Sequence, residues 1–449
     1  MPETPRAARG RTPAHTSPAY RAFVRVALAA WPMLQRQGRQ RNAHMQRLAA
    51  PGRMAEWSAA HRERSRPLAW FHAASVGEGL QARAVLEAFR TLRPEFQVVF
   101  THFSPSAESL GAAMPADLVS YLPYDRVGDI DAALDALSPD LLVFAKLDLW
   151  PELATRAAAR GTAVALVAAT VLADSGRLRW PARALLAPGY ASLATIGAVG
   201  REDADRLATL GADPECITVT GDPRIDSVLV LVDHAPPGIG LLAGDPALTL
   251  VAGSTWPADE KFLIGAFAAV RQARPDARLV VAPHEPSDAH IATLDATIAA
   301  AGLQPAVRLG AVGADTAPLV IVDRTGVLAS LYQHGGISYV GGGWGTAGIH
   351  SVLEPAAWSR PIIIGPHDRG SADARMLADA GALRRLPAVN PEIALATWWL
   401  ELLTDPAQQR NAGNAARATL DANRGAAERS AKLLDRLFPE SGSATAARG

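Results

Sequence analysis

The segment ISYVGGGWGTAGIHSVLEPAAWSRPIIIGPH, residues 337–367, decides the fold that the sequence predicts. Its first residues, 337–340, form a short apolar run whose length and β-branched content are typical of a buried parallel strand. A glycine-rich loop follows, then a helix predicted over 350–358 and a second apolar strand over 361–364. Strand, glycine loop, helix and strand are the layout of a nucleotide site, in which free N–H groups and the positive helix end face an anion.

The loop and the helix supply the first candidate binding residues. Residues without a Cβ let the backbone turn sharply and come close to a ligand, and the loop contains Gly341, Gly342, Gly343, Gly345 and Gly348. Glu354 lies one turn into the predicted helix, where a carboxylate can accept hydrogen bonds from a ribose diol. A glycine-rich turn in an ordinary α/β domain is the alternative. The glutamate at this spacing and the closing strand favour the nucleotide site.

The composition favours a large globular protein of a reducing compartment. A chain of 449 residues is too long for one average core, so two α/β domains are expected. The hydrophobic content of 49% indicates a globular rather than a disordered chain. The single cysteine, Cys216, excludes an internal disulfide framework. No CxxC, HExxH or other metal-ligand motif occurs, so a metal-dependent mechanism has no support.

Strand-like and helix-like segments alternate along most of the chain. One series occupies 68–233 and a second occupies 247–440, with the proline- and glycine-rich stretch 234–246 as the linker. The tail 441–449 is expected to be disordered. Strands separated by helices form parallel sheets, whose ligands bind at the carboxyl ends of the strands. The predicted fold class is therefore α/β, with two doubly wound Rossmann-like domains facing a cleft.

The first 67 residues differ from the rest in charge. Residues 1–67 contain thirteen Arg and three Glu, a net charge of +10 in a chain whose overall net charge is zero. Within them, the apolar run 20–34 is too short to span a bilayer and carries Arg21 and Arg25 on one helix face. This pattern predicts a membrane-associated interfacial helix, with its arginines drawn to anionic lipid. A helix packed on its own domain is the alternative, and no nucleic-acid recognition module accompanies the charge.

The polar loops that follow the strands resemble, in order and spacing, those of the bacterial 3-deoxy-D-manno-octulosonic acid (Kdo) transferases. The resemblance covers nearly the whole chain and rests on WFHAASVGE, YLPYD, LWPEL, GDPRID, AGSTWPADE, APHEP and the opening segment. It implies the glycosyltransferase-B fold and the transfer of Kdo from a CMP-Kdo donor to a lipid A precursor. The implied location is the cytoplasmic face of the inner membrane, on its anionic surface. No cofactor, metal ion or nucleic acid is implied.

The same resemblance implies the site residues. Glu78, the glutamate of SVGE, matches the family's catalytic base, while Asp148 and Arg224 match positions that stabilise the transition state. The positions that match the family's CMP contacts are Pro283, His284, Thr325, Gly326, Val327, Ser351, Val352, Leu353 and Glu354. Many members have glutamate at position 148, lysine at 224, arginine at 284 and asparagine at 351. Side-chain reach and charge at these four positions therefore differ from the usual pattern.

Sugar transfer from CMP needs a base for the acceptor hydroxyl and donors for the leaving phosphate. Glu78 is the predicted base, and the predicted donors are Arg224, His284 and the amides of the glycine loop, Gly342 and Gly343 among them. From the residues alone, Glu78 and Asp148 can each be a helix cap, and the rare Lys146 can be a solvated side chain. Packing or hydrogen-bonding roles are the interpretation for His72, Trp150, Trp256 and His350.

The expected function is a membrane-associated, metal-independent, inverting glycosyltransferase. Two alternatives stay open at this point. One is another nucleotide-sugar enzyme of the same fold, such as a lipid-linked hexosamine transferase or a sugar-nucleotide epimerase. The other is a non-catalytic lipid or nucleotide binder that has kept the scaffold.

Overall fold

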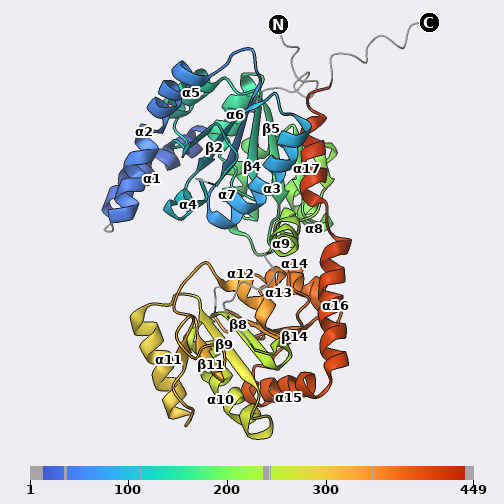
Figure 1. The fold of residues 1–449 in the computed structure, drawn as a ribbon. Helices are drawn as coiled ribbons and strands as arrows, with labels where there is room; N and C mark the ends of the chain where they lie inside the picture. Colours follow the sequence, from blue (N-terminus) through green and yellow to red (C-terminus); the bar gives the residue numbers. More distant parts are fainter. Residues whose placement is uncertain are drawn as a thin grey trace, which may run out of the picture. The chain divides into compact units, whose positions relative to one another are not determined.

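Two seven-stranded parallel sheets are formed by the residues that the computed structural model describes, 14–34, 38–111, 113–235, 242, 244–345 and 348–439 (Figure 1). Each sheet is the centre of one compact unit of the chain. The first unit runs to Ser227 and resumes at Gly425, and the second comprises Val228–Arg424. The prediction of two doubly wound Rossmann-like domains is thereby confirmed.

The sheet of the first unit has the strand order β3-β2-β1-β4-β5-β6-β7. The order reverses between β1 and β4, and doubly wound sheets bind their ligands at such a reversal. The strands are β1 (Leu68–Ala73), β2 (Gln97–His102), β3 (Leu118–Tyr121), β4 (Leu141–Ala145), β5 (Ala163–Ala169), β6 (Thr195–Ala198) and β7 (Ile217–Val219). The helices are α1 (Pro18–Leu34), α2 (Gly38–His61), α3 (Val76–Leu92), η2 (Pro105–Ala107), α4 (Glu108–Gly111), α5 (Val127–Leu137), α6 (Pro151–Ala159), η3 (Gly176–Leu178), α7 (Ala182–Ala191), α8 (Arg201–Thr209), η4 (Pro214–Cys216), α9 (Pro223–Asp233, which crosses the unit boundary) and α17 (Ala426–Asp435).

The sheet of the second unit has the order β10-β11-β9-β8-β12-β13-β14 and reverses between β8 and β12. Its strands are β8 (Thr249–Thr255), β9 (Arg278–Pro283), β10 (Val307–Arg308), β11 (Leu319–Ile321), β12 (Ile337–Val340), β13 (Ile362–Ile364) and β14 (Leu383–Arg385). Its helices are η5 (Pro246–Leu248), α10 (Pro257–Ala273), α11 (Asp288–Ala300), α12 (Leu328–Leu331), η6 (Tyr332–His334), α13 (Leu353–Ala357), α14 (Ala372–Asp379), α15 (Pro391–Thr404) and α16 (Pro406–Ala422).

Both sheets are buried on both faces. Successive side chains of a strand point to opposite faces, so the central strands contribute to two apolar clusters. In β1, Trp70 packs in one cluster, whereas Phe71 packs in the other with Phe89 of α3 and Leu434 of α17. Burial on both faces explains why these strands read as continuous apolar runs in the sequence.

Two boundaries differ from the prediction. The helix after the glycine loop begins at Leu353 rather than at residue 350, because the His350 N–H donates to the Gly341 carbonyl at 3.2 Å and so belongs to the loop. The chain also returns to the first unit at Gly425, where α17 packs on α3 (Figure 1), although the prediction kept 247–440 together. The periodicity of α17 indicates a buried face but not the distant partner that covers it. Most of the predicted linker and the whole predicted tail lie outside the described residues.

Within the described residues, the amino-terminal segment contains two helices, α1 and α2, and both belong to the first unit. The basic helix α2 packs on α5 and β3 through an apolar face that includes Ala43, Ala50 and Met54. Among the helices that the structure describes, none has both the length and the apolar content required to cross a bilayer. The sequence pattern did not predict α2 as a separate helix, because proline and two glycines interrupt a run rich in charge.

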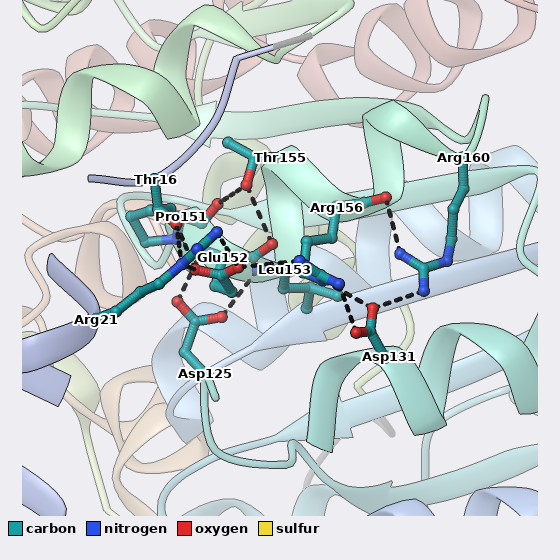
Figure 2. A network of polar contacts seen from close by, with 10 residues as sticks. All are labelled: Thr16, Arg21, Asp125, Asp131, Pro151, Glu152, Leu153, Thr155, Arg156 and Arg160. Carbon is teal, nitrogen blue, oxygen red and sulfur yellow. Dashed lines mark hydrogen bonds and ion pairs between the residues drawn. The ribbon is translucent and has the colours of Figure 1, made fainter. Parts of the chain in front are cut away.

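A polar network holds the beginning of α1 in place (Figure 2). Tyr20 donates its hydroxyl proton to the buried Asp125 at 2.6 Å. Arg21 donates two hydrogen bonds of 3.0 Å to Glu152 of α6, which also accepts one from Thr16. The Glu152 side chain is fully buried, so its charge requires this partner. The prediction that Arg21 faces lipid is therefore wrong, whereas Arg25 is exposed.

Candidate active site

Glu78 lies in the first turn of α3, shortly after the carboxyl end of β1. Its Oε2 accepts hydrogen bonds from the N–H and the hydroxyl of Ser75, at 3.1 and 3.0 Å. Its Oε1 lies 3.9 Å from Nζ of Lys146, which follows β4. One carboxylate oxygen therefore caps α3, and the other faces an ammonium group. Both the capping role and the role of a base are compatible with this geometry.

Asp148, near Lys146 in the same loop, is bonded to a buried histidine. Nε2 of His72 lies 2.7 Å from Oδ2 of Asp148, and the indole N–H of Trp150 donates to the same oxygen at 3.2 Å. Nδ1 of His72 lies 3.0 Å from both the carbonyl and the hydroxyl oxygen of Thr101. Burial alone would raise the pKa of Asp148, but the hydrogen bonds from His72 and Trp150 outweigh burial and lower it. Asp148 is thus held ionised in one orientation.

Arg224 lies at the start of α9 and is paired within its own loop. Its Nε and Nη2 donate to Oδ2 of the buried Asp222 at 2.8 and 2.5 Å. Gln81 of α3 donates to the other oxygen of Asp222 at 3.1 Å and links this loop to the helix that carries Glu78. Burial would raise the pKa of Asp222, but the charge and hydrogen bonds of Arg224 lower it. The guanidinium is fixed in place and partly neutralised by this carboxylate.

The second unit places an aromatic stack at the carboxyl edge of its sheet. His284 follows β9, Trp256 follows β8, and His350 lies in the loop after β12. The ring centroids of His284 and His350 are 4.2 Å apart, and those of Trp256 and His284 are 4.9 Å apart. The Trp256 indole N–H donates to Nε2 of His350 at 3.2 Å. Burial and the neighbouring His284 lower the pKa of His350 to about 4, so His350 is neutral.

The glycine loop needs its glycines for two different reasons. Gly342 has a φ of 97°, and its N–H donates to the buried carboxylate of Asp259 at 3.2 Å. At Gly343, a Cβ would lie 2.7 Å from the backbone of Gly365, closer than real side chains approach. The loop therefore keeps its shape only with glycine at both positions.

Glu354 lies in the first turn of α13 and is an unpaired acid of this edge. Within the described ranges, its carboxylate has no hydrogen-bond or ion-pair partner. Burial raises the pKa of Glu354 to about 7. A carboxylate that is partly desolvated and unpaired gains most from a ligand that donates two hydrogen bonds, as a ribose diol does.

The remaining predicted CMP contacts lie on neighbouring loops of the same edge. Because β11, β9, β8 and β12 are adjacent and parallel, the loops after them share one side of the sheet. Exposed positions after β11 and before α13 are Thr325, Gly326 and Ser351. Pro283 ends β9, and Val327 precedes α12. Val352 and Leu353 are buried in the core, so only their backbone groups can meet a ligand.

Sequence reasoning missed three residues that organise these edges. His72 agrees with its predicted packing or hydrogen-bonding role, but that prediction did not include its contact with Asp148, which it orients from a fully buried position. Asp259 and Asp222 had no assigned role, although each fixes a loop that carries predicted site residues. The only signal of the two aspartates in the sequence was a position a few residues after a strand, which is shared by many solvated acids. Lys146 was noticed for its rarity, and the structure places it beside Glu78.

Comparison with known proteins adds independent information. The family model described as 3-deoxy-D-manno-octulosonic-acid transferase (kdotransferase) matches residues 46–227, which end where the chain leaves the first unit. The 3-deoxy-D-manno-octulosonic acid transferase of Bordetella pertussis is 31% identical over 426 residues, which cover 90% of this chain and 95% of the relative. The Haemophilus influenzae protein of the same name is 25% identical over 385 residues, which cover 82% and 86%. Among solved structures, a UDP-GlcNAc 2-epimerase from Neisseria meningitidis has a TM-score of 0.58 at 13% identity, with 82% of this chain and 98% of that chain covered. This last likeness shows the fold alone.

Proposed function

Since the chain belongs to the 3-deoxy-D-manno-octulosonic acid transferase family and is a glycosyltransferase, we propose that it transfers Kdo from CMP-Kdo to a lipid A precursor. The proposed reaction inverts the anomeric carbon and uses no metal ion. The observation that carries the donor assignment is Glu354, an unpaired and partly desolvated carboxylate beside a glycine loop at the carboxyl edge of a doubly wound sheet.

In the proposed reaction, Glu78 takes the proton of an acceptor hydroxyl, and the hydroxyl oxygen forms a bond to the anomeric carbon of Kdo. The bond between that carbon and the phosphate oxygen breaks, and CMP leaves with the electron pair. Arg224, His284 and the amides of the glycine loop offset the charge that develops on the phosphate. Asp148, held ionised by His72, stabilises positive charge that develops on the sugar as the leaving group departs.

A comparison of nucleotides tests the donor class. CMP is expected to raise the melting temperature of the protein in a concentration-dependent way, because a ligand that binds only the folded state stabilises it. UDP at the same concentration is expected to have little effect. A larger shift with UDP would contradict the CMP-sugar donor and favour a UDP-sugar enzyme of the same fold.

Replacing Glu354 by alanine is expected to weaken CMP binding by about 1–3 kcal/mol, the usual cost of losing hydrogen bonds to a charged acceptor. The measurement is titration calorimetry with CMP. Glu392→Ala, an acid on α15 of the same unit, is the matched control and should leave the affinity unchanged. Unchanged CMP affinity in Glu354→Ala would refute the ribose contact.

The pH dependence of nucleoside binding provides a second test of the proposed contact between Glu354 and ribose. The ionised carboxylate accepts both ribose hydroxyls, so affinity for cytidine, which has no phosphate, should fall as pH is lowered through the pKa of Glu354, about 7. Glu354→Gln should remove that dependence. Cytidine binding that is equally pH-dependent in both proteins would assign the titration to another group.

Replacing His284 by alanine is expected to lower turnover, because the departing phosphate loses one of its donors. His284→Arg keeps a donor at this position and should retain more of the activity. The measurement is turnover of CMP-Kdo by the unmodified protein and by both variants. Equal turnover in all three proteins would leave the phosphate to Arg224 and the glycine loop.

We also propose that the enzyme works on the cytoplasmic face of the inner membrane and is held there by α1. Phe23 and Val26 are 62% and 70% exposed on this helix, and Arg25 is exposed beside them. Apolar side chains flanked by arginine on a surface helix favour an anionic lipid surface. Tyr20 and Arg21 have buried partners, so they contribute to holding α1 on the protein rather than to lipid contact.

The double substitution Phe23→Glu with Val26→Glu is expected to lower sedimentation with anionic vesicles and turnover of a lipid acceptor, while CMP binding stays intact. Val389→Glu with Ile393→Glu introduces the same charges at two comparably exposed apolar positions of the second unit, 75% and 67%, and serves as the control. Equal vesicle binding by the α1 variant and the unmodified protein would refute the membrane role of α1.

A further inference from the structure

A cavity of about 350 Å³ opens beside the glycine loop of the second unit and has no role in the function proposed above. It lies between the start of α10 and the loop after β12. The residues that line it are Trp256, Pro257, Ala258, Asp259, Gly342, Trp344 and Gly345. Ligand pockets of proteins commonly have volumes of about 300–1,000 Å³, so this one fits a single ring with its substituents rather than a whole nucleotide sugar.

One buried carboxylate holds both walls of this cavity. Asp259 accepts hydrogen bonds from the Trp256 N–H at 2.8 Å and from the Gly342 N–H at 3.2 Å. It also accepts one from the Tyr339 hydroxyl at 2.6 Å, and Tyr339 in turn accepts the indole N–H of Trp344 at 3.2 Å. The two tryptophans are therefore fixed before any ligand arrives, which lowers the entropy lost on binding.

The polar side chains of the lining are already hydrogen-bonded within the protein. Both indole N–H groups donate within the protein, Trp256 to His350 and Trp344 to Tyr339. The Asp259 carboxylate has three donors. What the lining offers to a ligand is mainly apolar and aromatic surface. Such surface suits a ligand face of C–H bonds, because the electron-rich face of an aromatic ring attracts the positive end of a C–H dipole.

Two residues of the lining belong to, or contact, the groups that are proposed to hold the phosphate. The Trp256 ring contacts the ring of His284, with a centroid distance of 4.9 Å, and Gly342 belongs both to the glycine loop and to the lining. The charge of Glu354, proposed to hold the ribose, contributes to raising the pKa of Tyr332, which packs in the apolar cluster on the other face of the sheet from Tyr339. With the ribose on one side of the phosphate, the cavity on the other side is left for the second group that is attached to the phosphate.

We propose that this cavity is the subsite for the sugar of the donor, with the sugar ring packed against Trp256 and Trp344. This proposal rests on the proposed function. It assigns the sugar of the donor to the cavity, whereas CMP is assigned to Glu354 and the glycine loop. In a 2-ulosonic acid, the carboxyl group and the phosphate are attached to the same anomeric carbon. The carboxylate therefore stays at the His284 end, away from Asp259, and the rest of the ring occupies the cavity.

Trp344→Ala tests the subsite by separating the sugar from the nucleotide. The KM for CMP-Kdo is expected to rise about tenfold, whereas the dissociation constant for CMP, measured by calorimetry, stays within twofold of the unmodified value. Trp344→Phe keeps an aromatic ring and should restore most of the loss. Trp398→Ala removes a partly buried indole from α15 of the same unit and is the matched control. Melting temperatures of all variants report on folding.

An unchanged KM for CMP-Kdo in Trp344→Ala would overturn the subsite. A parallel loss of CMP affinity would also overturn it, because the cavity would then hold the nucleotide. If Trp344→Ala does not fold, Trp344→Phe is compared with Trp344→Leu, and equal KM values for these two would contradict an aromatic contact. Failure of the proposed function is a different result: the unmodified protein would neither bind CMP nor turn over CMP-Kdo.

Discussion

Replacing Glu78 by glutamine is expected to lower turnover about 10²–10⁴-fold, the contribution of a positioned general base. A hydroxyl is a poor nucleophile at neutral pH, so removal of the base slows the step in which the acceptor attacks. Glutamine keeps the size of the side chain and an oxygen that can still accept from the Ser75 N–H. CMP affinity should stay close to the unmodified value, because the proposed CMP residues belong to the second unit.

The capping role of Glu78 predicts a different pattern. Loss of an N-terminal cap lowers stability by about 1 kcal/mol and leaves the turnover of folded molecules nearly normal. Measuring turnover and melting temperature on one preparation separates the two roles. Glu87→Gln alters an exposed acid on the same helix, paired with Arg83, and serves as the control. A stable Glu78→Gln enzyme with most of its activity would end the case for a catalytic glutamate.

Replacing Arg21 by methionine is expected to lower the free energy of unfolding of the first unit by about 2 kcal/mol. Removing one partner of a buried ion pair costs about 3–5 kcal/mol, because the other charge is left buried. The cost is reduced here, because Arg21 is 35% exposed and Arg156 stays 3.5 Å from Glu152. Methionine keeps much of the apolar stem, so the lost interaction is mainly the charge (Figure 2).

Arg25→Met is the matched control for this prediction. Arg25 lies one turn further along α1, and its side chain is exposed. Its replacement should change the free energy of unfolding by less than about 0.5 kcal/mol, as is usual for surface positions. Denaturant unfolding of both variants gives the comparison. Equal free energies of unfolding for Arg21→Met and Arg25→Met would show that the Arg21–Glu152 pair contributes nothing net. In that case the double variant Arg21→Met with Glu152→Leu would be no more stable than Arg21→Met.

The sequence predicted the elements whose signals are local. The strands 337–340 and 361–364 read as apolar runs because parallel strands are buried on both faces, and the structure has β12 and β13 there. The glycine loop was recognisable because a φ of 97° at Gly342 and the contact of Gly343 with Gly365 require the absence of a side chain. Glu354 was found from its spacing after that loop.

What the sequence did not predict depends on partners far along the chain. Arg21 looks like a lipid-facing arginine until Glu152, 131 residues later, is placed beside it. The partner of His72 is Asp148, 76 residues away. The position of α17 on the first unit depends on α3, from which the whole second unit separates it in sequence. Periodicity and spacing describe one segment at a time, so such pairings lie beyond them.

Mass spectrometry of the lipid products tests the central claim most directly. The purified protein is incubated with CMP-Kdo and a tetraacyl lipid A precursor. The lipids are then extracted, and their molecular masses are measured. The account predicts that the precursor gains the mass of one or more Kdo residues and that CMP is released in proportion. In Glu78→Gln the same product should form at a rate lower by the factor given above. A precursor that keeps its mass after incubation with protein that binds CMP and is fully folded would contradict the account.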